Sequence, residues 1–221
     1  MSLRVLLCTL VVVLAVAPGT PAQQERRVAR RADTPIAAHL RPGDRVVTIA
    51  DDRPPPLFVN PPEGTSFAEW LIEIRALLFT GRIRQLRAAP TPGGDFIETT
   101  VVLDVDEILF EPDPERRLPA TVSFTLPGGT MMIDGVHVRG ELRWAHPPRE
   151  GMRYLVAASR GGKGELVVGA SSMFELDGEG PVRRLADVPF AADFGDLPEL
   201  AVLTDLRAAA AEQTGRASRD R

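Results

Sequence analysis

The 221-residue chain carries 26 basic and 30 acidic residues, for a formal net charge of −4, and 44% of it is hydrophobic. This length suits one domain of ordinary size with extensions, and the composition allows a real buried core. The acidic balance argues against a nucleic-acid partner, because such proteins present a basic surface. Arginine, alanine, proline and glycine are favoured and Lys163 is the only lysine, a bias that suggests a bacterium with a GC-rich genome.

The first 22 residues predict a secretory signal peptide. Arg4 precedes an apolar run from Val5 to Ala17, and small residues follow as far as Ala22. We expect cleavage there, with Gln23 first in the mature chain and no stable membrane span. An uncleaved anchor is the alternative, although the run is shorter than the roughly 20 residues that a membrane helix needs.

Cysteine usage limits the chemistry of the mature chain. Cys8 is the only cysteine, and it lies within the predicted signal peptide, too early and with the wrong neighbours for a lipoprotein. After cleavage no disulfide, catalytic thiolate or Cys-ligated zinc is possible. The exported fold must therefore be held together by its core.

Residues 23–64 predict an extended linker that is rich in arginine and proline. Four arginines lie close together at its start (Arg26, Arg27, Arg30 and Arg31), and a solvated linker is favoured over an anionic partner or a processing site. Val46 to Ile49 could form one strand. The proline clusters around it favour a stiff linker over a ligand for proline-recognition domains.

Ser66 to Leu78 predicts a helix at the start of the main domain, residues 65–186. Ser66 and Glu69 have the spacing of a capping box. Apolar residues then follow helical spacing: Phe67, Trp70, Leu71, Ile74, Leu77 and Leu78. We interpret Trp70 as a residue that packs in the core and does not stack on a ligand. We expect the helix to cover one opening or face of a β unit.

Short strands are predicted from about Phe79 to Leu185, because polar and apolar residues alternate with a period of two. The clearest run is Thr121 to Leu126, which Pro127-Gly128-Gly129 ends. Thr99 to Phe110 is longer. Met152 to Ala158 is apolar on both faces, as expected for a central strand.

Further strands and turns complete this region. Thr80 to Arg87 starts the sheet, with Gly81 permitting a close approach or a bulge. The other expected elements are strands at Glu165 to Ala170 and Ser172 to Leu176, a hairpin loop at Gly161 to Gly164, a turn at Asp134-Gly135, strand segments from Val136 to Trp144 broken at Gly140, and an exposed charged loop from Glu111 to Arg117. This spacing predicts a mainly β fold, a small barrel or a sandwich.

Residues 187–215 form a C-terminal extension in which we expect one helix. Asp196 or a neighbour can cap it, Pro198 fits its first turn, and Gly215 is a plausible end. Its apolar stripe is narrow: Leu200, Leu203, Leu206 and Ala210. Residues 216–221 are predicted to be a disordered tail.

The central half of the chain resembles a broad set of exported bacterial proteins of unknown function. The matching pieces are Gly81 to Ile83, Glu98 to Leu103, Leu126 to Gly129, Glu150 to Val156 and Gly169 to Phe174. The resemblance implies a small, closed or partly open antiparallel OB-like barrel, similar in outline to the inhibitor domain of metalloproteinase inhibitors. Two features depart from the pattern: the order Glu150-Gly151 is reversed, and Ser171-Ser172-Met173 stands where another glycine is usual. The inhibitors' disulfides and zinc-binding N-terminal cysteine are missing, so inhibitor activity is not implied.

The histidines and carboxylates are the first candidates for chemistry. His39, His137 and His146 have no metal-ligand spacing, and we interpret them as isolated surface or turn residues. Asp104, Asp106 and Glu107 cluster near a strand end. Carboxylates two apart on a strand share a face, which suits calcium or acid–base work, but a solvated strand face is favoured.

Nucleophiles and phosphate loops give weaker signals. Ser159, Ser171 and Ser172 lie at strand ends and have no Gly-x-Ser-x-Gly elbow. Gly161 to Gly164 contains a lysine among glycines but lacks Walker spacing. With 5% aromatic residues, the chain offers few stacking platforms for oligonucleotides.

The sequence therefore predicts no catalytic, cofactor-binding or metal-binding residues and no cofactor. We expect an exported, monomeric, non-enzymatic binding or interaction module, secreted or periplasmic, whose partner is an unknown protein or small ligand of the cell envelope. One alternative is a hydrolase that uses carboxylates such as Asp104 and Asp106. Another is a structural component of the envelope.

Overall fold

Two β-sheets and two α-helices make up the part of the chain that the computed structural model describes, residues 35–51, 61–178, 180–186, 194 and 197–219. The predicted signal peptide, the four arginines at the start of the predicted linker, and Asp196 lie outside the described residues. The mainly β prediction is confirmed. Among the described strands, however, no closed barrel forms.

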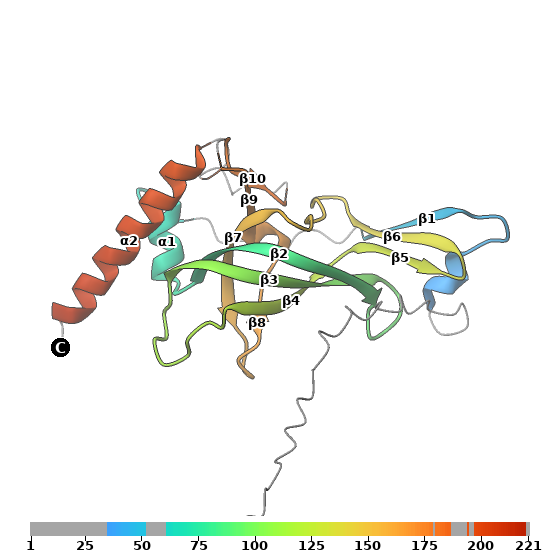
Figure 1. Cartoon of the computed structure of the whole chain (residues 1–221), viewed down its shortest axis with the longest axis horizontal. Coiled ribbons are helices and arrows are strands. Elements are labelled where there is room, and N and C mark those ends of the chain that lie inside the picture. The colour runs from blue at the N-terminus through green and yellow to red at the C-terminus, as the bar shows by residue number, and fades with distance from the viewer. Residues whose placement is uncertain (1–34, 52–60, 179, 187–193, 195–196, 220–221) are drawn as a thin grey trace, which may run out of the picture.

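The larger sheet has the strand order β10-β9-β7-β2-β3-β4, with β8 paired to β7, and all its pairings are antiparallel. Its strands are β2 (Leu77–Pro90), β3 (Ile97–Phe110), β4 (Thr121–Pro127), β7 (Arg153–Arg160), β8 (Leu166–Val167), β9 (Met173–Leu176) and β10 (Arg183–Arg184). The long strands β2 and β3 run between the helices at one end of the molecule and the smaller sheet at the other (Figure 1). They therefore connect the two ends.

The central strand β7 is covered on both faces, as its sequence predicts. Leu155 and Ala157 join a core that contains side chains of both helices, α1 (Phe67–Glu73) and α2 (Glu199–Arg219). Tyr154 and Val156 join a second core on the opposite face, with apolar residues of β2, β3 and β4. A strand between two cores has no solvated face, which explains its continuous apolar run.

Helix α1 begins as predicted but ends early. The capping box is confirmed: the Glu69 N–H donates to Ser66 Oγ, and the Ser66 N–H donates to the Glu69 carboxylate. The predicted extension to Leu78 is wrong, because Arg75 has a φ of 59° and Leu77 and Leu78 are the first residues of β2. Two consecutive leucines fit either element, and here they enter opposite cores of the sheet.

Gly81 marks a bulge, which confirms the sequence prediction. The register between β2 and β3 shifts between Thr80 and Gly81. A Cβ atom on Gly81 would lie 2.1 Å from Leu103 Cδ2 and 2.4 Å from the Asp104 carbonyl oxygen. Only glycine allows the neighbouring strand to approach this closely.

The smaller sheet has the order β1-β6-β5, built from β1 (Val46–Asp51), β5 (Gly129–Ile133) and β6 (Val136–Leu142). The predicted turn at Asp134-Gly135 connects β5 and β6, and β1 is parallel to β6. The short 3-10 helix η2 (Pro35–His39) packs Ile36 into the core of this sheet. Residues 35–51 thus contribute a turn and a strand, which differs from a plain linker.

Gly140 lies inside β6, so the predicted strand break at this residue is wrong. A Cβ atom there would stand 3.0 Å from the Ile97 Cβ and 3.3 Å from the Phe96 ring. The glycine therefore lets the smaller sheet pack closely on the start of β3 without interrupting its own strand.

The ends of the remaining strands mostly agree with the alternation of polar and apolar residues in the sequence. The strands at Thr121 to Leu126 and Thr99 to Phe110 are confirmed, and the loop Gly161 to Gly164 does connect an antiparallel pair, β7 and β8. The strand predicted at Glu165 to Ala170 is reduced to the two residues of β8, followed by the short 3-10 helix η3 (Ala170–Ser172).

Helix α2 continues through Gly215 to Arg219, so the predicted end at Gly215 is wrong, and residues 216–219 of the predicted tail belong to the helix. Leu203, Leu206 and Ala210 are buried as expected, whereas Leu200 is 74% exposed. These buried residues of α2 pack in the same core as the apolar residues of α1, and the two helices lie side by side (Figure 1). No described helix has the length and apolar character needed to cross a membrane.

Candidate functional site

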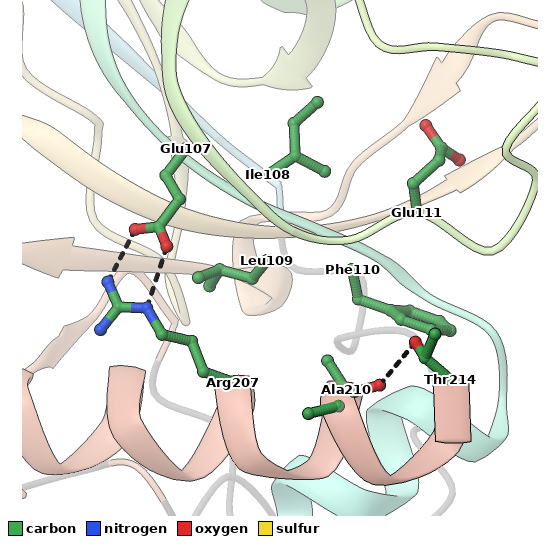
Figure 2. Close-up of a pocket in the computed structure, with 9 residues that line it drawn as sticks. Glu107, Ile108, Leu109, Phe110, Glu111, Arg207, Ala210 and Thr214 are labelled. Atoms are coloured by element: carbon green, nitrogen blue, oxygen red, sulfur yellow. Dashed lines mark hydrogen bonds and ion pairs between the residues drawn. The ribbon is translucent and has the colours of Figure 1, made fainter. Parts of the chain in front are cut away.

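Two bulges shape the end of β3 that lies against α2. Thr80 pairs with Glu107 and Gly81 with Val105, so that Asp106 is an extra residue on β3. A bulge resets the alternation of side chains after it. In a regular strand Val105 and Glu107 would point to the same face, because they are two residues apart. Here Val105 packs on the core away from the helices, whereas Glu107 faces α2 (Figure 2).

The second bulge lies three residues further along β3. Phe79 pairs with Ile108 and Leu78 with Phe110, which leaves Leu109 as the extra residue. Leu109 and Phe110 both pack against the helical core, and Figure 2 shows them directed to α2 while Ile108 points away. Ile108 is 43% exposed.

A hollow of about 350 Å³ lies between this end of β3 and α2. Its middle is formed by the apolar residues Leu109, Phe110 and Ala210, and polar residues lie toward its ends (Figure 2). The complete lining is Glu107, Ile108, Leu109, Phe110, Glu111, Arg207, Ala210, Ala211 and Thr214. Sequence reasoning missed this site, because it depends on both bulges and on the docking of α2.

A bidentate ion pair borders the hollow. The Arg207 Nε and Nη2 atoms donate to the two oxygens of Glu107 at 2.9 and 2.7 Å. These hydrogen bonds hold the pKa of the Glu107 carboxyl below its usual value of 4.5. The pair therefore ties α2 to the large sheet with the carboxylate ionised.

The pH dependence of this tie is testable with Glu107→Gln. Because the pKa of Glu107 is lowered in the folded state, its stabilisation is complete above the usual value of 4.5 and is lost as the pH falls through the folded-state value. At pH 7 we expect Glu107→Gln to lower the free energy of unfolding by about 0.5–1 kcal/mol, since the pair is partly solvated. Urea titrations at a series of pH values should show this difference shrinking in acid.

The matched control is Glu212→Gln. Glu212 also pairs with an arginine, Arg216, but both residues belong to α2 and neither contacts the sheet through this pair. An isolated pair of this kind contributes about 0.3–0.5 kcal/mol. Equal effects of the two substitutions at every pH would contradict the docking role of Glu107.

The other two carboxylates of the predicted cluster bind different arginines. Asp104 accepts a hydrogen bond from Thr121 Oγ1 at 2.8 Å and lies 3.4 Å from Arg84 Nη1. Asp106 lies 3.3 Å from Arg153 Nε. Asp104 and Asp106 were expected to be a candidate pair on one face, but each is engaged by a separate partner.

Arg153 also anchors the first turn of α2. Its Nη1 atom donates to Glu199 Oε1 at 2.6 Å, and the Gly178 N–H donates to Glu199 Oε2 at 2.8 Å. Glu199 is buried, so both carboxylate oxygens need these partners. The start of α2 is thereby fixed to β7 and to the turn after β9.

A polar cluster that includes the buried residues Tyr154 and Glu175 lies on the opposite face and was not predicted. The Tyr154 hydroxyl donates to Glu175 at 3.3 Å and accepts from the Arg149 N–H at 2.9 Å, and the Arg149 guanidinium pairs with the same carboxylate. Burial raises the pKa of Tyr154. A sequence signal existed, because Glu175 interrupts an apolar strand. The cluster joins β7 and β9 to the preceding loop, which is a structural role.

The remaining candidates are dispersed. His39, His137 and His146 are exposed and belong to η2, β6 and the segment after β6. Within the described ranges, no three residues of the types His, Cys, Asp and Glu gather as metal ligands would. Ser159 lies on β7, whereas Ser171 and Ser172 lie on η3.

No known family model matches this chain, and no curated protein sequence matches it. The role of the site must therefore be inferred from its geometry and chemistry.

Proposed function

We propose that the protein is a non-enzymatic binding module of a bacterial cell envelope, and that the hollow between β3 and α2 is its recognition surface. The observation that carries the proposal is the pairing of the three strand carboxylates. Asp104, Asp106 and Glu107 each bind an arginine from a different element, β2, β7 and α2 respectively. An arginine therefore occupies each of these carboxylates, which leaves none of them free to act on a substrate and favours binding over hydrolysis.

The hollow has the chemistry of a protein-binding surface. Its apolar middle lies between the Glu107–Arg207 ion pair and the side chains of Glu111 and Thr214 (Figure 2). Several lining residues of α2 are exposed, so the hollow is open to solvent, whereas small-molecule pockets enclose most of their ligand. Apolar side chains of a protein partner would pack on this middle and leave the ion pair at the rim.

We further interpret the larger sheet as a partly open OB-like barrel. Five of its strands are neighbours in the order β4-β3-β2-β7-β8, and β4 also lies near β8. Closure between β4 and β8 would complete a small five-stranded barrel. Helices α1 and α2 would then lie against its outer face.

Site-specific photocrosslinking in the producing bacterium tests the proposal. A photoreactive residue in place of Ala211, which lines the hollow, should give a discrete crosslinked product with an envelope protein. The matched control is Ala201, another exposed alanine of α2, which is not part of the lining. We also expect the mature chain in the envelope fraction to begin at Gln23.

Two results would count against this function. Products of equal yield from Ala211 and Ala201, or none from either, would mean that the hollow is not a recognition surface. Retention of the whole chain in the cytoplasm would remove the envelope as its location.

A further inference from the structure

The outer edge of β1 is open to pairing. β1 is the end strand of the smaller sheet, and none of the described strands pairs with its far side. From Val46 to Ala50 it contains no charge, proline or glycine. Native edge strands usually carry such residues, or are covered, because an uninterrupted edge recruits another strand.

The other edges of the described sheets are short or covered. β5 lies against β2 and β3, and β4 lies near β8. β10 consists of two arginines. β1 is thus the one long, uncharged edge in the part of the chain that the structure describes.

The backbone pattern defines which groups are available on this edge. The His137 N–H donates to the Arg45 carbonyl oxygen at 3.0 Å. In a parallel ladder, alternate residues direct their N–H and C=O groups to the same neighbour. Arg45, Val47 and Ile49 therefore bond toward β6, and the groups of Val46, Thr48 and Ala50 point outward.

We propose that two copies of this chain pair through β1, antiparallel, with Thr48 opposite Thr48 of the second copy. This register also places Val46 opposite Ala50, so that every outward-pointing residue forms a hydrogen-bonded pair. It would add about six backbone hydrogen bonds and join the two small sheets into one. Val46, which is 64% exposed, would be partly covered.

The charges at the ends of β1 fit this register. Arg45 precedes the strand and Asp51 ends it, and Val47 and Ile49 lie between them on the same face. In the proposed pairing Arg45 lies opposite Asp51 of the second copy at both ends, and Val47 lies opposite Ile49. Opposite charges across antiparallel strands are favourable. Because the edge is complementary to itself under a twofold rotation, a second copy is a better occupant than an unrelated strand.

Charge reversal tests the pairing on protein purified from expression of the full chain. Sedimentation at increasing concentration should reveal a weak dimer, since six strand residues bury less area than a stable interface needs. Arg45→Glu and Asp51→Arg should each raise the dimer dissociation constant about tenfold or more, because each opposes like charges. The double variant should return to within about threefold of the parent. Arg116→Glu, on the 111–117 loop, is the charge control.

A second experiment leaves the charges unchanged. A hydrogen-bonded antiparallel pair has Cα atoms about 5.5 Å apart, which lies within disulfide range. Thr48→Cys should therefore form a crosslinked dimer on mild oxidation. Thr130→Cys is the matched control, because Thr130 and Thr48 pair with the same residue, Arg139, in the same sheet.

A monomer at every concentration, or equal crosslinking of Thr48→Cys and Thr130→Cys, would overturn the proposal. A dimer that Arg45→Glu does not weaken would also overturn it. The inference depends on β1 alone and is independent of the hollow between β3 and α2.

Discussion

Replacing Phe67 with alanine should lower the free energy of unfolding by about 3–5 kcal/mol, the cost of removing a large aromatic side chain from a packed core. The Phe67 ring centroid lies 5.5 Å from that of Trp70, 6.2 Å from Phe174 and 4.7 Å from Phe194. These rings come from α1, β9 and the segment before α2, so the cavity would loosen several elements at once. Urea denaturation followed by circular dichroism measures the change.

Phe67→Leu is the control for this prediction. Leucine keeps much of the apolar volume, and we expect a cost of about 1–1.5 kcal/mol. If alanine and leucine had the same small effect, the cluster around Phe67 would not be the main attachment of the helices to the sheet.

The second large effect is expected from Gly81→Ala. The added methyl group would overlap the Asp104 carbonyl oxygen, at 2.4 Å, which belongs to the backbone of β3 and cannot rotate away. Strands β2 and β3 would have to separate at their bulge. We expect destabilisation of about 3 kcal/mol, at the upper end of the range for overpacking.

Gly162→Ala provides the comparison for Gly81→Ala. Gly162 lies in the loop between β7 and β8, and a Cβ atom there would have no other atom within 4 Å. Its substitution should leave the unfolding free energy within about 0.5 kcal/mol of the parent. Similar denaturation midpoints for the two variants would show that the close approach at Gly81 is not required.

The sequence was informative where local alternation decides the structure. In Thr121 to Leu126 polar and apolar residues alternate with a period of two, a pattern that fits a strand and not a helix. Strand β4 lies where this pattern predicts it. Leu77 and Leu78 fit both the helical stripe and a strand, and only packing against two separate cores settles which element they join. Boundaries of this kind depend on tertiary contacts that a local pattern does not contain.

The candidate site was less predictable for a related reason. The rule that residues two apart share a face assumes a regular strand, and the extra residue Asp106 breaks it in β3. The partners of the strand carboxylates, among them Arg153 and Arg207, come from distant parts of the chain. Nothing in the spacing of the carboxylates indicates these arginines, so the hollow could not be foreseen.

The parallel pairing of β1 with β6 also bears on biosynthesis. Val46 to Asp51 leave the ribosome well before Val136 to Leu142, the only described strand with which they pair. During that interval an apolar, strand-prone segment has no neighbour, and nascent chains in such a state are prone to aggregate. The smaller sheet can therefore form only after Leu142 has emerged, and a chaperone that shields its first strand until then would raise the yield of correctly assembled protein.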